Sequence, residues 1–326
     1  KKVWFANGIH HHYSNDKFKP EFTEEWFREQ LAQYINDENR QMDDDLLCQI
    51  IFDPMLCASR LNRSEGVDVI KASAGNYYEG VSQAEVEAFY TAMAEADKGN
   101  PEPISYGLNS KLMRDSEGNI FENVWKVGGM YSAAIEQIVF WLEKAATVAN
   151  PTQKEIIDAL VKYYRSGDLK DFDAYNVLWV KDSASNVDFV NGFIENYGDP
   201  LGHKSSWEAV VNFRDEEACH RTEIMAANAQ WFEDNAPINP AYRKEEVKGV
   251  SAKVITVAML GGDCFPSTAI GINLPNADWI RKEHGSKSVT IDNITYAYDK
   301  AAQGNGFMEE FVLRAEDRER LKKYGK

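Results

Sequence analysis

Helix-like and strand-like segments follow one another along this chain in no regular order. Strand-like patterns occupy the segments 187–197, 207–213, 253–260, 270–275 and 289–294. Two further extended stretches, 104–108 and 120–125, flank a glycine turn at 115–119, which predicts a β-hairpin. Helical patterns cover 24–35, 82–96, 131–148, 150–167, 171–179, 216–232 and 309–323. Because these elements do not alternate as repeated βαβ units, we predict an α+β fold and not a doubly wound parallel sheet.

Two of the predicted helices carry explicit start signals. Ser82 and Glu85 have the spacing of a capping box, in which the two residues satisfy free backbone N–H groups at a helix start. Asn150 followed by Pro151 is typical of an N-cap with proline at the first helical position. Both helices are therefore predicted to begin directly after these capping residues.

The acidic composition limits the classes of partner. Asp and Glu number 52 against 36 Lys and Arg, which gives a formal net charge of -16. Such a chain repels phosphate backbones, so nucleic-acid binding is disfavoured, whereas ligands with a charged amino terminus are tolerated. The sequence has no apolar run long enough to span a membrane. Its four cysteines form no CxxC pair, which disfavours a zinc knuckle or a disulfide framework and fits the cytoplasm.

Three groups of possible metal ligands occur, and none has the spacing of a zinc site. They are the triple His10-His11-His12, the pair His220 and Glu223, and the pair Glu309 and Glu316. Adjacent histidines on a strand point to opposite faces, the i, i+3 pair lacks a second histidine, and glutamates alone rarely hold zinc. We therefore predict no metal ligand set within this sequence.

A first candidate site lies in the segment 192–200. On an extended backbone Glu195, Tyr197 and Asp199 would share one face. The carboxylate could hold an ammonium group, and the phenol could donate a hydrogen bond to an oxyanion. The alternative is a buried structural network, because carboxylates and phenols are costly to bury without partners.

A second candidate site lies in the segment 270–276. Gly271 allows close approach of another backbone, and Pro275 removes a hydrogen-bond donor and therefore suits an edge strand. Asn273 and Asn276 offer amide donors and acceptors. Such an edge can pair with an extended peptide. The alternative is a glycine-proline turn capped by the two asparagines.

Taken together, the two candidate segments resemble the signatures of the dipeptidyl peptidase III family. The segment 193–202 looks like the first signature, and 271–276, with the residues that follow to 287, looks like the second. The resemblance runs in order from near Trp4 to the end of the sequence, and the opening 7–18 is similar to the bacterial, Bacteroides-type branch.

The resemblance implies a two-lobed, zinc-dependent exopeptidase that removes dipeptides from the amino terminus of short peptides. One lobe contains a β-barrel surrounded by helices and binds substrate; the other is mostly helical and carries the zinc. On this basis 1–215 and 255–302 are expected to form the β-barrel lobe. The segments 216–254 and 303–326 are expected to be a truncated part of the catalytic lobe.

Roles for five residues follow from the same resemblance. Glu195, Asn273 and Asn276 would hold the free ammonium group of a peptide. Tyr197 would stabilise the developing oxyanion at the scissile carbonyl, and Gly271 would present backbone groups to the peptide.

The sequence departs from the family in its metal motifs. It contains neither HExxGH nor an EExRxE-type motif, so the zinc ligands and the general base of the family are absent. Both ends of the sequence resemble positions inside a longer protein. We therefore expect a fragment that binds peptides, needs the missing C-terminal part of the same protein, and is inactive alone.

Two alternatives stay open at this stage. The chain could be a non-catalytic peptide-binding protein whose full natural length is this sequence, and such a protein would not need the metal motifs. It could instead act on carbohydrate, since it has eight Trp, fifteen Tyr and many carboxylates. No pair of carboxylates is marked by the sequence as the two that a glycosidase requires.

Overall fold

The computed structural model divides into two compact units, which are described separately. It describes residues 8–11, 14–36, 38–40, 42–247, 250–265, 268–301 and 311–324. The first unit comprises Lys1–Asp182, Asn191–Glu208 and Ala277–Ile280. The second comprises Ser183–Val190, Ala209–Asn276 and Arg281–Lys326.

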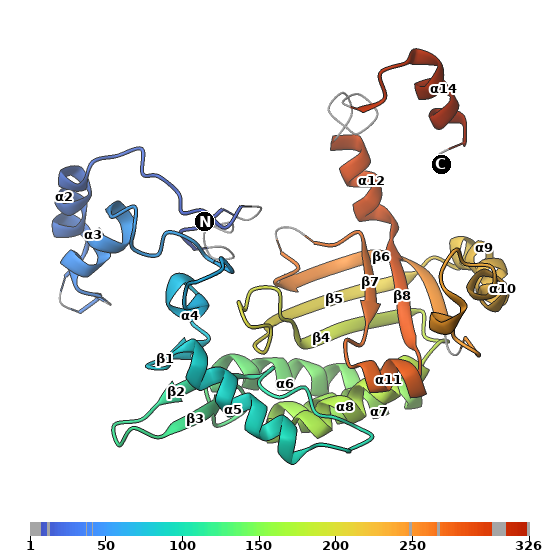
Figure 1. Ribbon diagram of the computed structural model, residues 1–326, viewed down its shortest axis with the longest axis horizontal. Helices are drawn as coiled ribbons and strands as arrows, with labels where there is room; N and C mark the ends of the chain where they lie inside the picture. Colours follow the sequence, from blue (N-terminus) through green and yellow to red (C-terminus); the bar gives the residue numbers. More distant parts are fainter. Residues whose placement is uncertain are drawn as a thin grey trace. The chain divides into compact units, whose positions relative to one another are not determined.

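The described part of the first unit begins with the helices α2 (Glu24–Tyr34), α3 (Asp44–Phe52) and α4 (Val69–Ala72). Helices α2 and α3, drawn in blue in Figure 1, lie side by side. The Thr23 hydroxyl caps α2, and the Asp43 carboxylate caps α3 by accepting two backbone N–H groups. Each cap satisfies donors that a helix start leaves without partners.

A three-stranded sheet follows, formed by β1 (Tyr78–Glu79), β2 (Ser110–Arg114) and β3 (Ile120–Val124) in that order. Strands β2 and β3 form the predicted hairpin, and β1 pairs with β2 in parallel. The prediction for its first arm was wrong, because 104–108 is not a strand and its last three residues lie in a turn. Gly107 has a φ of +94°, which interrupts an extended backbone.

Helix α5 (Gln83–Ala96) starts where the capping box predicts. The Glu85 carboxylate accepts from the backbone N–H of Ser82 at 2.9 Å and from its hydroxyl at 2.8 Å. The inner face of α5 packs on the small sheet through a buried apolar cluster. This cluster consists of Val81, Val86, Tyr90 and Leu112.

Three consecutive helices complete the first unit: α6 (Ser132–Ala146), α7 (Pro151–Ser166) and α8 (Leu169–Lys181). Asn150 caps α7 as predicted, and Gly167 ends it in the left-handed conformation. The three helices pack in sequence order. Helices α7 and α8 bury a largely aromatic set of side chains, namely Ile156, Leu160, Tyr163, Tyr164, Phe172, Tyr175 and Trp179.

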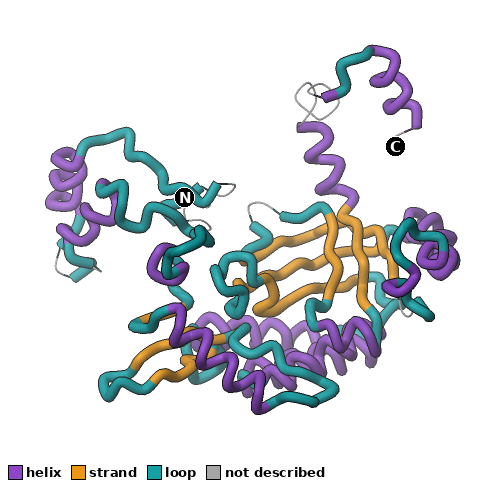
Figure 2. The backbone as a smooth tube through the Cα atoms, in the orientation of Figure 1, coloured by secondary structure: helices purple, strands orange, loops and turns teal. Residues whose placement is uncertain are grey.

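A five-stranded sheet has the order β4-β5-β6-β8-β7. Figure 2 draws its strands in orange. Its strands are β4 (Val187–Glu195), β5 (Ser206–Arg214), β6 (Val250–Gly262), β7 (Gly271–Leu274) and β8 (Ser286–Ile291). Strands β6 and β8 pair in parallel, whereas β7 and β8 pair in antiparallel. The predicted α+β class is confirmed.

The expected β-barrel is not found among the strands that the structure describes. A closed barrel requires the first and last strands of the order to pair with each other. Here β4 and β7 end the order, so the described sheet is open. The resemblance suggested closure, but closure depends on pairing between distant strands, which local periodicity does not encode.

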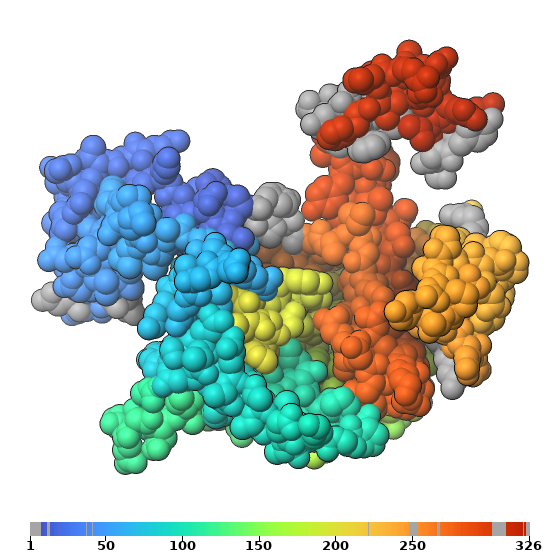
Figure 3. Space-filling model, in the orientation of Figure 1, coloured from blue at the N-terminus to red at the C-terminus, as the bar shows by residue number. Residues whose placement is uncertain are grey.

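The second unit also contains α9 (Glu216–Ala227), α10 (Ala229–Asp234) and the short 3-10 helix η1 (Pro240–Tyr242). The prediction of one helix over 216–232 was wrong, because Asn228 separates α9 from α10. Its side chain donates to the Ile224 carbonyl at 2.7 Å and so satisfies the end of α9. Both helices lie on the surface (Figure 3) and expose apolar side chains, namely Ile224, Met225, Trp231 and Phe232.

Helix α12 (Asp292–Ala301) directly follows β8, so the strand predicted over 289–294 ends early. The side-chain oxygen of Asn293 accepts a hydrogen bond from the N–H of Val257 on β6, and its side-chain nitrogen donates one to the Val257 carbonyl, at 3.0 Å each. This pairing fixes the start of α12 against the sheet.

The last described helix is α14 (Ala315–Tyr324). In the predicted helix 309–323, Glu309 and its neighbour at 310 lie outside the described residues, and 312–314 is not helical. The Arg318 side chain donates a hydrogen bond to the Val312 carbonyl. In a continuous helix that carbonyl would accept from a backbone N–H instead.

Helix α11 (Asp278–Glu283) contributes residues to both units. Within the part of the chain that the structure describes, no helix combines the length and apolar character needed to cross a membrane.

The buried Asp173 on α8 generates a prediction about pH. Its side chain is 7% exposed, and burial raises its pKa to about 7. The native state therefore holds a proton that the unfolded chain releases near its ordinary pKa of 3.8, so stability is lost as pH rises towards 7. We expect Asp173→Asn to raise the free energy of unfolding at pH 8 by about 2 kcal/mol.

Urea unfolding at pH 5 and pH 8 checks this expectation. The matched control is Asp158→Asn on α7, which removes an exposed carboxylate that pairs with Lys154 at 2.5 Å. The control should change stability little at either pH. Equal pH dependence of Asp173→Asn and the unsubstituted protein would contradict the assignment.

Candidate peptide-binding elements

Glu195 is the last residue of β4 in the first unit. Its backbone carbonyl accepts from the Ser206 hydroxyl of β5 at 3.1 Å. Tyr197 lies two residues further on, in a turn, with 74% of its side chain exposed. The predicted common face of Glu195, Tyr197 and Asp199 is wrong, because the strand ends at Glu195 and its alternation does not continue into the turn.

Asp199 organises this turn from its interior and is fully buried. One carboxylate oxygen accepts from the Tyr78 hydroxyl at 2.7 Å and from the N–H groups of His203 at 2.7 Å and Lys204 at 2.8 Å. The other accepts from the Leu201 N–H at 3.2 Å. A carboxylate with several charge-assisted bonds to backbone donors holds a turn in one conformation. The structural-network alternative therefore applies to Asp199.

Two further side chains stabilise the same turn by donating hydrogen bonds to its backbone carbonyls. The Arg63 guanidinium donates to the carbonyls of Asp199 at 2.7 Å and Pro200 at 3.2 Å. The Asn196 amide donates to the Gly202 carbonyl at 2.5 Å and closes the turn on itself. The turn is thus fixed at both ends, while the Tyr197 phenol reaches solvent.

Lys204 ends the turn as a fully buried cation. Its ammonium group donates to the Tyr90 hydroxyl and to the Ser110 hydroxyl, the latter at 2.8 Å. The Glu122 carboxylate lies 3.5 Å away and accepts from both of those hydroxyls. Burial lowers the pKa of Lys204 to about 8, against the opposing effect of Glu122 and Asp199. No local sequence pattern marks this cluster, because its members come from four separate segments.

Gly271 and Asn273 lie on β7 in the second unit, at one end of the five-strand order. The predicted edge strand is therefore confirmed. Gly271 pairs with Thr290 and Asn273 with Ser288, both on β8, and no described strand pairs with the opposite side of β7. Gly271, Asn273 and Asn276 are all exposed.

The backbone of β7 fits closely against β8. A Cβ atom at Gly271 would lie 3.1 Å from the Val289 carbonyl oxygen, which is a tight contact. Leu274 pairs with the fully buried Lys287, whose ammonium group donates to Asp188 at 2.8 Å. A buried ion pair of this kind disfavours other registers of β8, since a one-residue slip would move Lys287 to the opposite face.

The two groups of predicted site residues belong to different units. Glu195 and Tyr197 are in the first unit, and Gly271, Asn273 and Asn276 are in the second. Within each unit the residues are neighbours along one short segment.

The described residues do not fit a zinc site. They contain no group of three or more His, Cys, Asp and Glu side chains that could hold a metal ion. His10 instead bonds the Cys57 carbonyl at 2.8 Å, and His220 lies 3.3 Å from Glu223. His12 lies outside the described residues.

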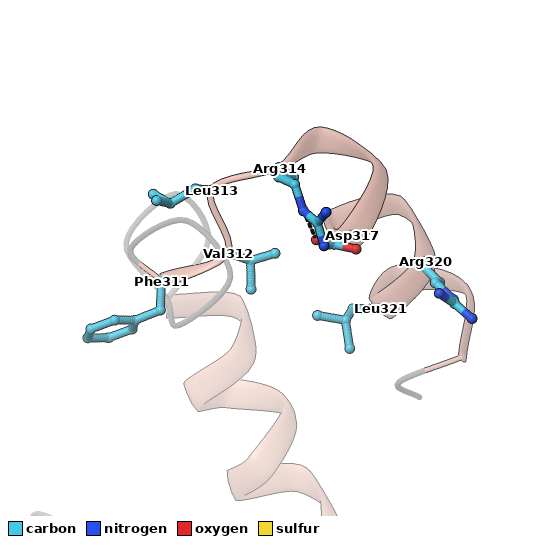
Figure 4. A pocket seen from close by; sticks show the side chains of 7 residues that line it. All are labelled: Phe311, Val312, Leu313, Arg314, Asp317, Arg320 and Leu321. Atoms are coloured by element: carbon cyan, nitrogen blue, oxygen red, sulfur yellow. Dashed lines mark hydrogen bonds and ion pairs between the residues drawn. The ribbon is translucent and has the colours of Figure 1, made fainter.

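A crevice of about 1020 Å³ lies at the last described helix. Figure 4 shows its lining, which comes wholly from the segment that leads into α14 and from α14 itself. The lining residues are Phe311, Val312, Leu313, Arg314, Asp317, Arg320 and Leu321. None of the predicted site residues lines this crevice, and it has no cluster of groups suited to chemistry.

Comparison with known proteins assigns the family. The model of "Peptidase family M49" matches residues 83–326, which is more than half of the chain. The chain therefore belongs to this family, the dipeptidyl peptidase III family, and the predicted resemblance is confirmed.

Dipeptidyl peptidase 3 of Rattus norvegicus is 29% identical over 215 residues, which cover 65% of this chain and 28% of the rat protein. Dipeptidyl peptidase 3 of Mus musculus is 29% identical over 206 residues, which cover 62% and 27%. The chain thus spans less than a third of the length of these relatives.

The solved structure of dipeptidyl-peptidase III from Corallococcus sp. strain EGB has the same fold. Its TM-score is 0.63 at 22% identity, with 90% of this chain and 53% of that chain covered.

The hydrogen bond from Tyr78 to Asp199 generates the second prediction. Tyr78→Phe removes one of three donors to a buried carboxylate oxygen, so we expect the free energy of unfolding to fall by about 1–2 kcal/mol. Urea unfolding at pH 7 measures the change. Tyr34→Phe, on the exposed surface of α2, is the control and should be neutral. A neutral Tyr78→Phe would show that the bond does not stabilise the turn.

Proposed function

We propose that this chain supplies the peptide-binding groups of a zinc-dependent metallo-exopeptidase that releases N-terminal dipeptides from short peptides. Membership of Peptidase family M49 supports a peptide substrate. The edge position of β7 is the structural observation on which the proposal chiefly rests.

The exposed edge of β7 can receive a peptide as an added strand. An edge strand has one row of backbone N–H and carbonyl groups without a neighbouring strand, and an extended peptide can pair with them. Gly271 would present its backbone groups to the peptide at this edge. Affinity would come mainly from backbone hydrogen bonds, which makes the site tolerant of peptide sequence.

The polar side chains of the two segments would select a free amino terminus. Glu195 would supply negative charge to the ammonium group, and Asn273 and Asn276 would supply amide oxygens. The net charge of -16 also favours ligands with a positive end. An acetylated peptide lacks that charge.

Tyr197 would donate a hydrogen bond to the carbonyl oxygen of the peptide bond to be cleaved. A phenol held in place by a rigid turn can stabilise negative charge that develops there. Its 74% exposure leaves the hydroxyl accessible to a ligand. The fixed turn beneath it limits the entropy that is lost on binding.

The metal and the general base would come from outside these 326 residues. The sequence has no HExxGH motif, and the described residues hold no three-ligand group. We therefore propose that this chain alone is inactive and needs the remainder of a longer protein. In that protein 1–215 and 255–302 would belong to the substrate-binding lobe, and 216–254 and 303–326 to the catalytic lobe. None of the four cysteines, all of which the structure describes, is in a disulfide bond, which fits a cytoplasmic location.

Calorimetric titration with a tetrapeptide tests the ammonium role. We expect the free peptide to bind and the N-acetylated peptide to bind at least about tenfold more weakly, because one charge-assisted contact is lost. Glu195→Gln should weaken binding of the free peptide similarly and leave the acetylated peptide unaffected. Asn273→Ala tests the second unit separately and should also weaken binding.

The matched control is Glu143→Gln, which removes an exposed carboxylate on α6 that pairs with Arg165. It should leave the affinity for both peptides unchanged. Equal affinity for both peptides, together with a silent Glu195→Gln, would refute the assigned site.

Hydrolysis of a fluorogenic dipeptidyl substrate tests the proposed inactivity. With one equivalent of zinc added, we expect no release above the background of zinc alone, because the chain lacks the family's ligand set. Zinc-dependent release by this chain, abolished by a chelator, would contradict the proposal. Equilibrium dialysis with zinc provides a second readout and should detect no tight site.

A further inference from the structure

We propose that the cluster of Lys204, Tyr90, Ser110 and Glu122 is a positioning device for the 196–204 turn, and that it acts on peptide binding through Tyr197. Its effect on peptide binding rests on the function proposed above. Its effect on the turn does not, and the two are tested separately.

Lys204 connects the turn directly to the interior of the first unit. Its backbone N–H donates to Asp199 at 2.8 Å, so its main chain is part of the turn. Its side chain runs into the core and donates to Tyr90 on α5 and Ser110 on β2. One residue thus joins the conformation of the turn to the packing of α5 on the small sheet.

The partners of the Lys204 ammonium group hold it at one position in the interior. An ammonium group in the interior is unfavourable unless hydrogen bonds and an opposite charge compensate its lost hydration. Glu122 on β3 supplies the charge, and the two hydroxyls that bond Lys204 also bond Glu122. The ring of Tyr90 adds a cation–π contact at 4.7 Å. Displacing the ammonium group would leave Glu122 and the hydroxyls short of partners.

Tyr90 brings a second connection to the same turn. Its ring stacks on His203 with a centroid distance of 4.4 Å and an interplanar angle of 26°. Gly107 makes room for it, since a Cβ atom there would lie 2.9 Å from the Tyr90 hydroxyl oxygen. The N–H of His203 also donates to Asp199. The cluster therefore holds two successive residues of the turn.

Tyr78 and Asp199 complete the path from the cluster to Tyr197. The ammonium group of Lys204 lies 5.9 Å from the centre of the Tyr78 ring, and the Tyr78 hydroxyl donates to Asp199. Asp199 in turn accepts from three N–H groups that follow Tyr197 in the chain. Displacing Lys204 would thus loosen the support of the segment that carries the phenol.

Amide hydrogen exchange of the complete chain is the first test. In Lys204→Met the side-chain volume is kept and the ammonium group is removed. We expect the amides of Leu201, His203 and residue 204 to exchange at least about tenfold faster, beyond any change in global stability. Lys204→Arg keeps the charge and should restore part of the protection.

Leu160→Ala is the matched control, because it removes a fully buried side chain of α7, which belongs neither to the turn nor to the cluster. It should lower global stability and leave the selective protection of the turn intact. If Lys204→Met does not fold, Ser110→Ala is tested in its place. This variant removes one hydrogen-bond partner of the ammonium group. Unchanged protection of the three amides in the folded variant would overturn the proposal.

A double-mutant cycle on peptide affinity tests the link to Tyr197. If the cluster acts through Tyr197, the affinity lost in Lys204→Met should be much smaller in a Tyr197→Phe background. Fully additive losses would overturn this link even if the turn loosens. If the unsubstituted chain binds no peptide, the proposed function fails, whereas the exchange experiment still decides whether the cluster holds the turn.

Discussion

The buried carboxylate of Asp199 is the interaction on which the first candidate segment depends. Four donors converge on its two oxygens, three of them backbone N–H groups of its own turn. Burying a carboxylate without such donors would cost free energy, because its lost hydration would not be replaced. Because Asp199 makes these bonds, the chain can leave β4 abruptly, and Tyr197 stays exposed on a fixed support. Lys204 connects this turn to the core of the first unit, because its backbone N–H donates to Asp199 and its side chain donates to buried hydroxyls.

The second candidate segment is held by a different kind of force. β7 has only four residues and pairs with β8 alone among the described strands. Its register is stabilised by the burial of Leu274 and by the ion pair between Lys287 and Asp188. These contacts fix the strand without covering its outer edge. An edge that is well ordered on one side and open on the other suits strand addition.

Family membership and local structure constrain function at different levels. Peptidase family M49 covers three quarters of the chain and points to peptide chemistry. The residues proposed to bind a peptide are in this chain, whereas the sequence contains no HExxGH motif and the described residues hold no three-ligand metal group. Peptide binding and peptide cleavage can therefore be tested independently with this chain.

The sequence by itself determined the class of the fold and most of its elements. The capping signals at Ser82 and Asn150, the helices that follow them and the glycine hairpin are local, because each depends on residues within one turn or one hairpin. The two signatures and the edge character of 270–275 were readable for the same reason. The tertiary structure alone decided the strand order, the open sheet and the cluster around Lys204. Lys204 lies more than 80 positions along the chain from Tyr90, Ser110 and Glu122, and no local periodicity predicts which distant side chains will surround a buried charge.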